Sequence, residues 1–238
     1  TSKILLTGAN GFVGRAILKR VRAEGAAVCA VVRGEEDPPG CVRGPALGAA
    51  AKWAPLLAGC DAVIHAAARV HVMDETAHDP LAAFREVNVA GTLNLAQQAA
   101  EAGIRRFVFI SSIKVNGEAT ASGQAFTSTD TPAPMDAYAS SKAEAEAGLI
   151  SLAAETGMEV VIVRPPLVYG PGVKGNFLSM MRWLKRGIPL PLGAILHNRR
   201  SLVALDNLVD LILACIDHPA AANQVFLASD GEDVSTTG

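Results

Sequence analysis

The glycines near the N-terminus constrain the fold of this chain more than any other feature. Gly8, Gly11 and Gly14 follow a short apolar run, Ile4–Leu6, and precede a segment with helical periodicity, Val13–Glu24. Glycines between a strand and a helix permit a tight turn and let the backbone approach a pyrophosphate at the helix N-terminus. The spacing is G-x-x-G-x-x-G rather than G-x-G-x-x-G, and a glycine triplet alone could equally be an ordinary turn. The strand–turn–helix order favours a dinucleotide-binding turn.

The alternation of short apolar runs with longer helical patterns continues along the chain. It predicts an α/β fold, a doubly wound, Rossmann-like parallel sheet whose strands are covered on both faces. The predicted strands are Ile4–Leu6, Ala27–Val32, Ala62–His65, Phe107–Ile110 and Val160–Val163, and the predicted helices are Val13–Glu24, Pro80–Ala102 and Ala137–Glu155. Gly25, Gly103 and Gly157 follow these helices, where glycine suits a left-handed C-cap. A long loop is expected at Asn116–Met135.

Beyond the last predicted central strand, prolines interrupt the pattern. We therefore expect a dinucleotide-binding domain over residues 1–165 and a small, incomplete C-terminal substrate lobe over residues 166–238. Within the lobe we expect helices near Phe177–Arg186 and Asn207–Ile216, and a strand at Gln224–Leu227 that could return to the sheet.

Composition argues against several classes of protein. Of the 238 residues, 50% are hydrophobic and 18% are charged, which predicts a substantial core. The net charge is −2 with scattered Arg and Lys, so we expect no nucleic-acid binding. No apolar run reaches the roughly 18–20 residues of a membrane span and no signal peptide precedes the first strand, so we expect a cytoplasmic protein away from membranes. The four cysteines and five histidines lack metal-ligand spacing, which predicts free thiols and no metal site.

A second motif follows the glycines by about 130 residues. Tyr138 and Lys142 are four residues apart and share one face of a predicted helix. An ammonium near a phenol lowers the pKa of the phenol toward the range that a general acid/base needs. Ser112, where a predicted strand ends, could hold a substrate oxygen. The alternative is an amphipathic helix with a core Tyr and a solvated Lys, but Ser111-Ser112 and the glycine turn favour the catalytic interpretation.

The residue at the end of the second predicted strand bears on cofactor choice. An acidic residue there would bond the adenosine ribose hydroxyl, whereas an Arg can pair with a 2′-phosphate. Arg33 holds this position and slightly favours NADP over NAD. The alternative is a solvated Arg33, with Glu35, Glu36 or Asp37 bonding the ribose.

Together these motifs resemble the extended short-chain dehydrogenase/reductase family, the NAD-dependent nucleotide-sugar epimerases, dehydratases and reductases. The similarity runs from residue 4 to about residue 228 and includes T-G-A-N-G-F-V-G, D-A-V-I-H-A-A at 61–67, N-V-A-G-T at 88–92, Ser111-Ser112, Y-A-S-S-K at 138–142, R-P-P-L-V-Y-G-P-G at 164–172, and 200–208. The resemblance implies that Ser112, Tyr138 and Lys142 are catalytic and that Lys142 also holds the nicotinamide ribose.

The resemblance also implies binding residues. On the substrate side, Asn176 and Arg200 are implied as contacts to the diphosphate of a UDP-linked sugar, although Asn176 could be a helix N-cap and Arg200 a surface charge. The implied cofactor contacts are Gly8, Asn10, Gly11, Phe12, Val13, Gly14, Arg33, Ala66, Ala67, Asn88, Tyr138, Lys142 and Pro165.

We therefore expect an NAD(P)-dependent epimerase with hydride transfer at C4 of a UDP-hexose. The family's dehydratases often carry Asp-Glu after the catalytic Ser, where this chain has Ile113 and Lys114, so 4,6-dehydration is not expected. One alternative is an NADPH-dependent 4-keto-sugar reductase, which Arg33 favours. Another is a non-catalytic dinucleotide-sensing regulator, a class that typically lacks the Tyr/Lys pair. Family members are commonly longer, and a homodimer is left open.

Overall fold

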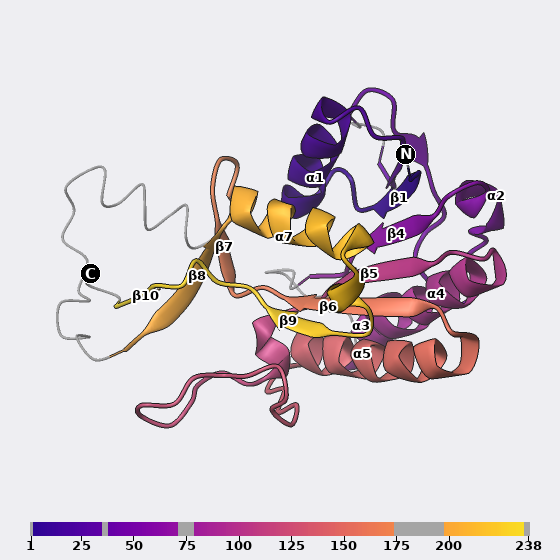
Figure 1. Ribbon diagram of the computed structural model, residues 1–238. Helices are drawn as coiled ribbons and strands as arrows, with labels where there is room; N and C mark the ends of the chain where they lie inside the picture. The colour runs from indigo at the N-terminus through magenta and orange to yellow at the C-terminus, as the bar shows by residue number, and fades with distance from the viewer. Residues whose placement is uncertain (1, 35–37, 71–78, 174–197, 236–238) are drawn as a thin grey trace.

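The computed structural model describes residues 2–34, 38–70, 79–173 and 198–235. At its centre lies a seven-stranded sheet in the order β3-β2-β1-β4-β5-β6-β9, and every pair of neighbouring strands is parallel (Figure 1). The strand order reverses between β1 and β4, and the carboxyl ends of strands at such a reversal are where ligands bind in open α/β sheets. The strands are β1 Ile4–Thr7, β2 Val28–Val32, β3 Val42–Arg43, β4 Ala62–His65, β5 Arg106–Ile110, β6 Glu159–Arg164 and β9 Val225–Leu227.

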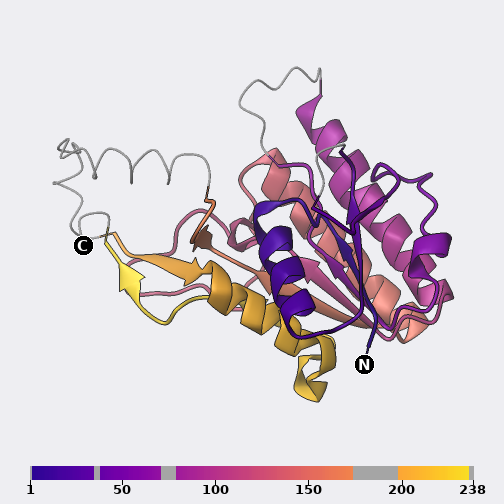
Figure 2. The same ribbon diagram turned by 90° about the horizontal axis from the view of Figure 1, so that it is seen from above.

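Helices cover both faces of the sheet (Figures 1 and 2). On one face lie α1 Phe12–Ala23 and α7 Leu205–Asp217, and on the other lie α2 Ala54–Leu57, α4 Gly91–Glu101 and α5 Ala137–Thr156. Successive strand residues point to opposite faces, so Leu6 and Ile64 pack with α1 and α7, whereas Leu5 and Val63 pack with α4 and α5. Two separate apolar layers result, which explains why the strands are apolar throughout.

The predicted α/β fold is confirmed. Each strand expected from the sequence is present to within one residue at either end. The left-handed glycines predicted after three helices are also present, with φ values of +71° at Gly25, +76° at Gly103 and +76° at Gly157. The short elements β3 and α2 were not predicted, because two and four residues are too few to show a periodicity.

The helix predicted over Pro80–Ala102 is not a uniform α-helix. It consists of α3 Pro80–Phe84, a π-helical segment η1 Arg85–Ala90, and α4. Asp79 begins it, accepting a hydrogen bond from the Ala82 amide at 3.0 Å. Short π-helical segments are frequent at functional sites, and this one carries Asn88.

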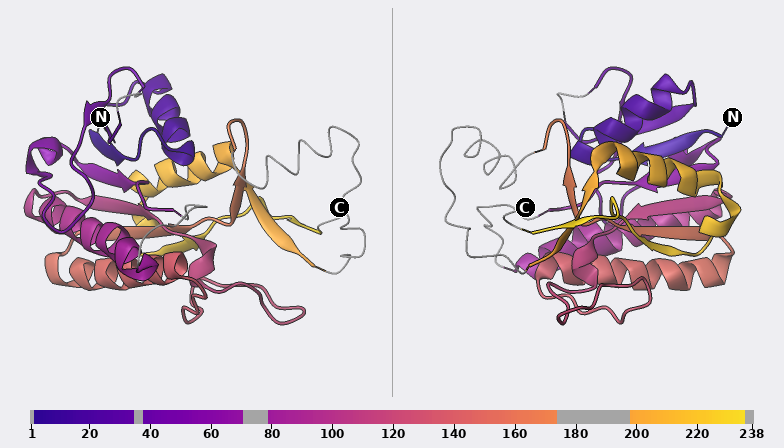
Figure 3. Two further views of the ribbon diagram at one scale, coloured as in Figure 1. Left: turned by 180° about the vertical axis from the view of Figure 1, so that it is seen from behind. Right: turned by 60° about the vertical axis from the view of Figure 1, so that its left-hand side comes forward.

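A second, three-stranded sheet projects beyond the central one (Figure 3). It contains β7 Leu167–Tyr169, β8 Arg200–Ala204 and β10 Asp233–Val234, with β8 parallel to β7 and antiparallel to β10. Asp230 ties it to α7, because it accepts hydrogen bonds from the Tyr169 hydroxyl and the Asn207 amide, both at 2.7 Å. The predicted helix Phe177–Arg186 lies outside the described residues, and the division into domains at residue 165 stays a prediction.

The glycine turn is closely packed against its neighbours. Gly8 has a φ of +69°, and a Cβ there would lie 2.7 Å from the Ala67 amide nitrogen. A Cβ on Gly14 would lie 2.0 Å from the Gly8 carbonyl oxygen, whereas one on Gly11 would lie 3.2 Å from that oxygen. The packing of β1, β4 and α1 therefore requires glycine at positions 8 and 14. At position 11 a Cβ would be much less crowded.

Gly14→Ala is expected to destabilise the fold although alanine favours helix. The clash is with backbone, which cannot rotate away, so the net loss should be at least about 1–3 kcal/mol. Urea unfolding would measure it, with Gly11→Ala as the matched control, for which we expect a smaller loss. Equal stability of Gly14→Ala and the unmutated protein would contradict this account.

Candidate active site

The carboxyl edge of the sheet collects most of the residues singled out from the sequence. Gly8 follows β1, Arg33 follows β2, Ala66 follows β4 and Ser112 lies just beyond β5. Parallel strands end on the same edge, so these positions lie along one edge of the sheet. Arg33 is exposed there, and Ala66 and Ala67 lie directly against Gly8. Pro165 follows β6, and its carbonyl accepts from the Ile113 amide at 3.0 Å.

The N-terminus of α1 fits a pyrophosphate. Gly11 is its N-cap, no side chain among the described residues caps the helix, and its first turn contains no acidic residue. The amides at Phe12 and Val13 therefore open the helix with its positive dipole end uncompensated. The Asn10 carbonyl accepts from Arg15 Nε at 2.9 Å, which steadies the turn.

Asn88 joins the segment after β4 to the start of α5. Its amide nitrogen donates to the Arg69 carbonyl and to the Ser141 hydroxyl, both at 3.0 Å. Its carbonyl oxygen accepts from the Arg69 amide at 2.8 Å. The Ser141 hydroxyl in turn donates to the Tyr138 carbonyl at 2.7 Å. From the π-helical segment η1, Asn88 thus holds the first turn of α5 in place.

Tyr138 lies in the first turn of α5 and Lys142 lies one turn further along. The Tyr138 ring is half-buried and meets Phe84 edge-on, with 6.1 Å between ring centroids. Lys142 is fully buried; its ammonium donates to the Ile110 carbonyl at 2.8 Å and lies 4.4 Å from the Phe109 ring centroid. Helix α5 is therefore fixed against the end of β5.

Burial shifts both pKa values toward the neutral forms. The pKa of Tyr138 rises to about 12, first because of burial and then because of Asp136, while Lys114 lowers it. The pKa of Lys142 falls to about 7 because of burial, and Glu146 opposes that fall. The sequence led us to expect that Lys142, together with the positive nicotinamide of a bound cofactor, lowers the pKa of Tyr138. Among the protein groups alone, burial outweighs the cations and raises this pKa, and the cation that lowers it is Lys114.

Ser112 caps a short 3₁₀ turn, η2 Ile113–Val115, and its hydroxyl oxygen accepts from the Lys114 amide at 3.3 Å. Because the oxygen accepts from this amide, the hydroxyl hydrogen of Ser112 remains available to donate to a substrate oxygen. Ser112 and the first turn of α5 both flank the carboxyl end of β5, since Lys142 contacts the carbonyl of Ile110.

A buried polar network lies beneath Ser112, and the sequence analysis missed it. Arg164 donates three hydrogen bonds to Glu146, from Nε to Oε1 at 3.0 Å and to Oε2 at 3.2 Å, and from Nη2 to Oε2 at 2.5 Å. It also donates to Asn116 Oδ1 at 2.9 Å. The Ser111 hydroxyl also donates to Glu146. The sequence did offer a signal: Glu146 is four residues after Lys142 and eight after Tyr138, on the same helix face.

His65 is a second buried group whose role the sequence did not reveal. Its Nδ1 lies 2.7 Å from the Thr7 hydroxyl and its Nε2 lies 2.9 Å from the Thr92 hydroxyl. The pKa of His65 falls to about 3, chiefly because of burial and then because of Lys142. A neutral imidazole therefore links β1, β4 and α4 directly under the glycine turn.

The two residues expected on the substrate side have different outcomes. Arg200 begins β8 in the second sheet and is exposed, whereas Asn176 lies outside the described residues. Within the described ranges, no group of three or more His, Cys, Asp and Glu residues is placed to hold a metal ion. None of the helices in those ranges is both long and apolar enough to cross a membrane. None of the four cysteines, all of which lie in the described ranges, forms a disulfide.

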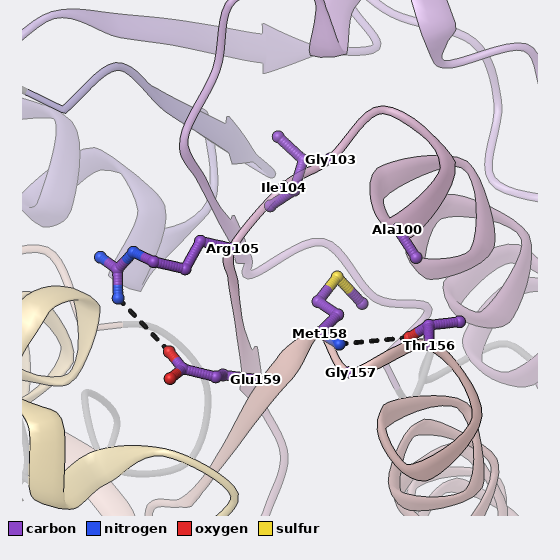
Figure 4. Close-up of a pocket in the computed structure, with 8 residues that line it drawn as sticks. All are labelled: Ala100, Gly103, Ile104, Arg105, Thr156, Gly157, Met158 and Glu159. Atoms are coloured by element: carbon purple, nitrogen blue, oxygen red, sulfur yellow. Dashed lines mark hydrogen bonds and ion pairs between the residues drawn. The ribbon is translucent and has the colours of Figure 1, made fainter.

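A separate cavity of about 290 Å³ lies at the opposite edge of the sheet, where β5 and β6 begin (Figure 4). Arg105 and Glu159 form an ion pair of 3.3 Å beside it. It contains none of the residues expected to bind cofactor or substrate, so we assign the site to the carboxyl edge. The cavity is lined by Ala100, Gly103, Ile104, Arg105, Thr156, Gly157, Met158 and Glu159.

Comparison with known proteins identifies the family of the chain. The NAD dependent epimerase/dehydratase family matches residues 4–228. The chain belongs to this family. One family relative, the UDP-glucose 4-epimerase of Vibrio cholerae, is 52% identical over 236 residues, which cover 98% of this chain and 72% of the relative.

Solved structures of the family share the fold. MoeE5 in complex with UDP-glucose and NAD superposes with a TM-score of 0.82 at 26% identity, covering 99% of this chain and 79% of its own. The dTDP-glucose 4,6-dehydratase DesIV from Streptomyces venezuelae, with NAD bound, superposes with a TM-score of 0.80 at 26% identity, covering 99% and 78%. The extended short-chain dehydrogenase/reductase fold expected from the sequence is therefore confirmed.

Because folding keeps His65 in its neutral form, the free energy of unfolding should depend on pH. The folded pKa of about 3 lies below the ordinary value of 6.5, so the unfolded chain binds a proton that the folded protein excludes. The stabilisation is complete above pH 6.5 and is lost as the pH falls toward 3, with a slope of up to about 1.4 kcal/mol per pH unit.

His65→Gln keeps a polar side chain that does not titrate. We expect it to lower stability at pH 7 but to reduce the slope of unfolding free energy between about pH 6 and pH 4, measured by urea unfolding. Identical slopes in the two proteins would show that His65 does not contribute to the pH dependence.

Proposed function

We propose that this chain interconverts UDP-hexoses that differ at C4, using a bound NAD(P). The observation that carries the proposal is that one sheet edge collects the glycine turn, Ser112 and the Tyr138–Lys142 pair. Such a turn suits a pyrophosphate, and a phenol and a serine hydroxyl at the same sheet edge suit proton transfer at a sugar hydroxyl. The relative from Vibrio cholerae, a UDP-glucose 4-epimerase, supports the same substrate class and reaction.

The cofactor would lie along the carboxyl edge of the sheet. Its pyrophosphate would meet the amides at the N-terminus of α1, and its adenosine ribose would lie near Arg33. Tyr138 and Lys142 would hold the nicotinamide ribose. The remaining proposed contacts are Gly8, Asn10, Gly11, Phe12, Val13, Gly14, Ala66, Ala67, Asn88 and Pro165.

In the proposed reaction, Tyr138 takes the proton from the C4 hydroxyl and later returns it. Ser112 donates its hydroxyl hydrogen to the same sugar oxygen and keeps it oriented. A bound NAD(P) in its oxidised form would supply the acceptor for the C4 hydride and a positive charge in the site. Lys142, with a pKa of about 7, is partly protonated at neutral pH and adds positive charge on the face of α5 that carries Tyr138.

The phenol of Tyr138 must lose its proton far below its pKa of about 12 in the structure. Nearby positive charge is the physical means of lowering that pKa, because it favours the phenolate. Glu146 helps indirectly, since its carboxylate raises the pKa of Lys142 and so favours the ammonium form.

The nucleotide end of the substrate would lie toward the second sheet. We propose that Arg200 on β8, and Asn176, hold the diphosphate. A guanidinium suits this role because its planar fork can donate two parallel hydrogen bonds to phosphate oxygens.

A second candidate function is an NADPH-dependent 4-keto-sugar reductase. Arg33 favours it, because an exposed guanidinium at the end of β2 can pair with a 2′-phosphate. Dehydration is less favoured, because Ile113 and Lys114 supply no acid pair after Ser112. A purified protein that retains NAD and converts UDP-glucose to UDP-galactose without added cofactor supports the epimerase, whereas net NADPH consumption with a 4-keto sugar supports the reductase.

Tyr138→Phe tests the chemistry directly. The ring and its contact with Phe84 remain, so folding and dinucleotide binding should survive, while turnover falls by roughly 10²–10⁴-fold. The matched control is Tyr169→Phe, the other tyrosine of the chain, whose hydroxyl binds Asp230 in the second sheet. A folded Tyr138→Phe protein that turned over UDP-hexose at the original rate would reject the mechanism.

Arg33 tests cofactor choice. We expect the unmutated protein to bind NADP(H) more tightly than NAD(H), and Arg33→Asp to reverse the preference, because a charge-assisted hydrogen bond contributes roughly 1.5–3 kcal/mol. Titration calorimetry with both dinucleotides would measure this, and Arg43→Asp on the neighbouring strand β3 is the control. Equal affinities for the two cofactors in the unmutated protein would contradict the assignment.

A further inference from the structure

Lys114 contacts the surroundings of both proposed catalytic side chains. Its backbone amide donates to the Ser112 hydroxyl oxygen at 3.3 Å. Its ammonium lies 2.7 Å from a carboxylate oxygen of Asp136 and 3.3 Å from Glu118. The side chain is 44% exposed, so its charge costs little desolvation.

Asp136 is the N-cap of α5, the helix that carries Tyr138. One oxygen of its carboxylate accepts from the Ala139 amide at 2.6 Å, and the other accepts from Lys114. The ion pair therefore joins η2, which begins immediately after Ser112, to the first turn of α5. Lys114 thus links the segment that carries Ser112 to the segment that carries Tyr138, although Lys114 and Asp136 are 22 residues apart in the sequence.

We propose that Lys114 is a positioning residue, which holds Ser112 and Tyr138 in register and supplies a fixed cation beside the phenol. The inference rests on the proposed function, in which these two groups act on one sugar oxygen. According to this proposal, the cation of the protein that acts on the Tyr138 phenol is Lys114 and not Lys142. The exposed location of Lys114 means that it acts from the rim of the site rather than from the core.

The electrostatics agree with this geometry. Lys114 lowers the pKa of Tyr138 and Asp136 raises it, so the two members of the ion pair act on the phenol in opposite directions. The pKa of Lys114 is itself raised, first by the hydrogen bond to Asp136, so the cation persists through the assay range. Two further charged groups of the described residues lie on neighbouring elements: Lys142, one turn along α5, and Arg69, which lies 5.6 Å from the ring centroid of Phe84, the residue that the Tyr138 ring meets edge-on.

Lys114→Met removes the charge and keeps the backbone amide that contacts Ser112. With the full chain, NAD and UDP-glucose, we expect the acid limb of the kcat–pH profile to move up by about one pH unit. On that limb kcat should fall about tenfold, with KM for the sugar within a factor of two. Lys114→Arg keeps the charge and should therefore keep the pH profile of the unmutated protein. Lys19→Met removes a charge from the exposed face of α1 and serves as the control, whose pH profile should not change.

Asp136→Asn gives a test of opposite sign. It keeps an oxygen to cap α5 but removes the charge that raises the pKa of Tyr138, so the acid limb should move to lower pH. Opposite shifts in the two variants would support the proposal, because a merely structural contact would weaken both proteins in the same direction.

Two results would overturn the inference. One is an unchanged pH profile in Lys114→Met with a loss confined to thermal stability, and the other is a shift of the same sign in Lys114→Met and Asp136→Asn. Failure of the proposed function is distinguishable from both, because the unmutated protein would then show no conversion of UDP-glucose, or conversion that Tyr138→Phe leaves intact.

Discussion

The buried ion pair of Glu146 and Arg164 holds the parts of the site together. It connects α5 to the end of β6, and through Ser111 and Asn116 to the end of β5 and the loop that follows it. Removing one partner of such a pair typically costs about 3–5 kcal/mol, because the other charge is left buried and uncompensated. The position of Ser112 relative to the first turn of α5 therefore depends on Glu146 and Arg164, although neither residue is among the proposed substrate or cofactor contacts.

Burial sets the charge states within this frame. His65, Tyr138 and Lys142 all shift toward their neutral forms, and in each the largest cause is loss of solvent. Lys114, at the rim, shifts the other way because Asp136 and Glu118 accept from it. The groups around Tyr138 that lie in the interior therefore shift toward neutral forms, apart from the paired Glu146 and Arg164, whereas the rim is charged. Charge brought by a dinucleotide would then act with little screening on the phenol and the ammonium.

The elements predicted well from the sequence are those with a long or strongly apolar pattern. The central strands and α1, α5 and α7 follow from apolar periodicity, and the glycines at their ends follow from backbone geometry. The helix at Pro80–Ala102 was expected to be regular, but its middle turn is π-helical. The residue pattern does not distinguish i+4 from i+5 hydrogen bonding, and the packing of Asn88 against Arg69 and Ser141 accompanies the wider turn.

The sequence by itself determined the parallel α/β sheet, the glycine turn and the helical spacing of Tyr138 and Lys142, because these depend on local geometry and on periods of two and 3.6 residues. Only the tertiary structure decided which charges meet. Lys114 with Asp136, and Glu146 with Arg164, pair across segments that the chain separates by 22 and 18 residues. The sign of the Tyr138 pKa shift also belongs to the tertiary structure, because desolvation depends on what packs around a group and not on its neighbours in the sequence.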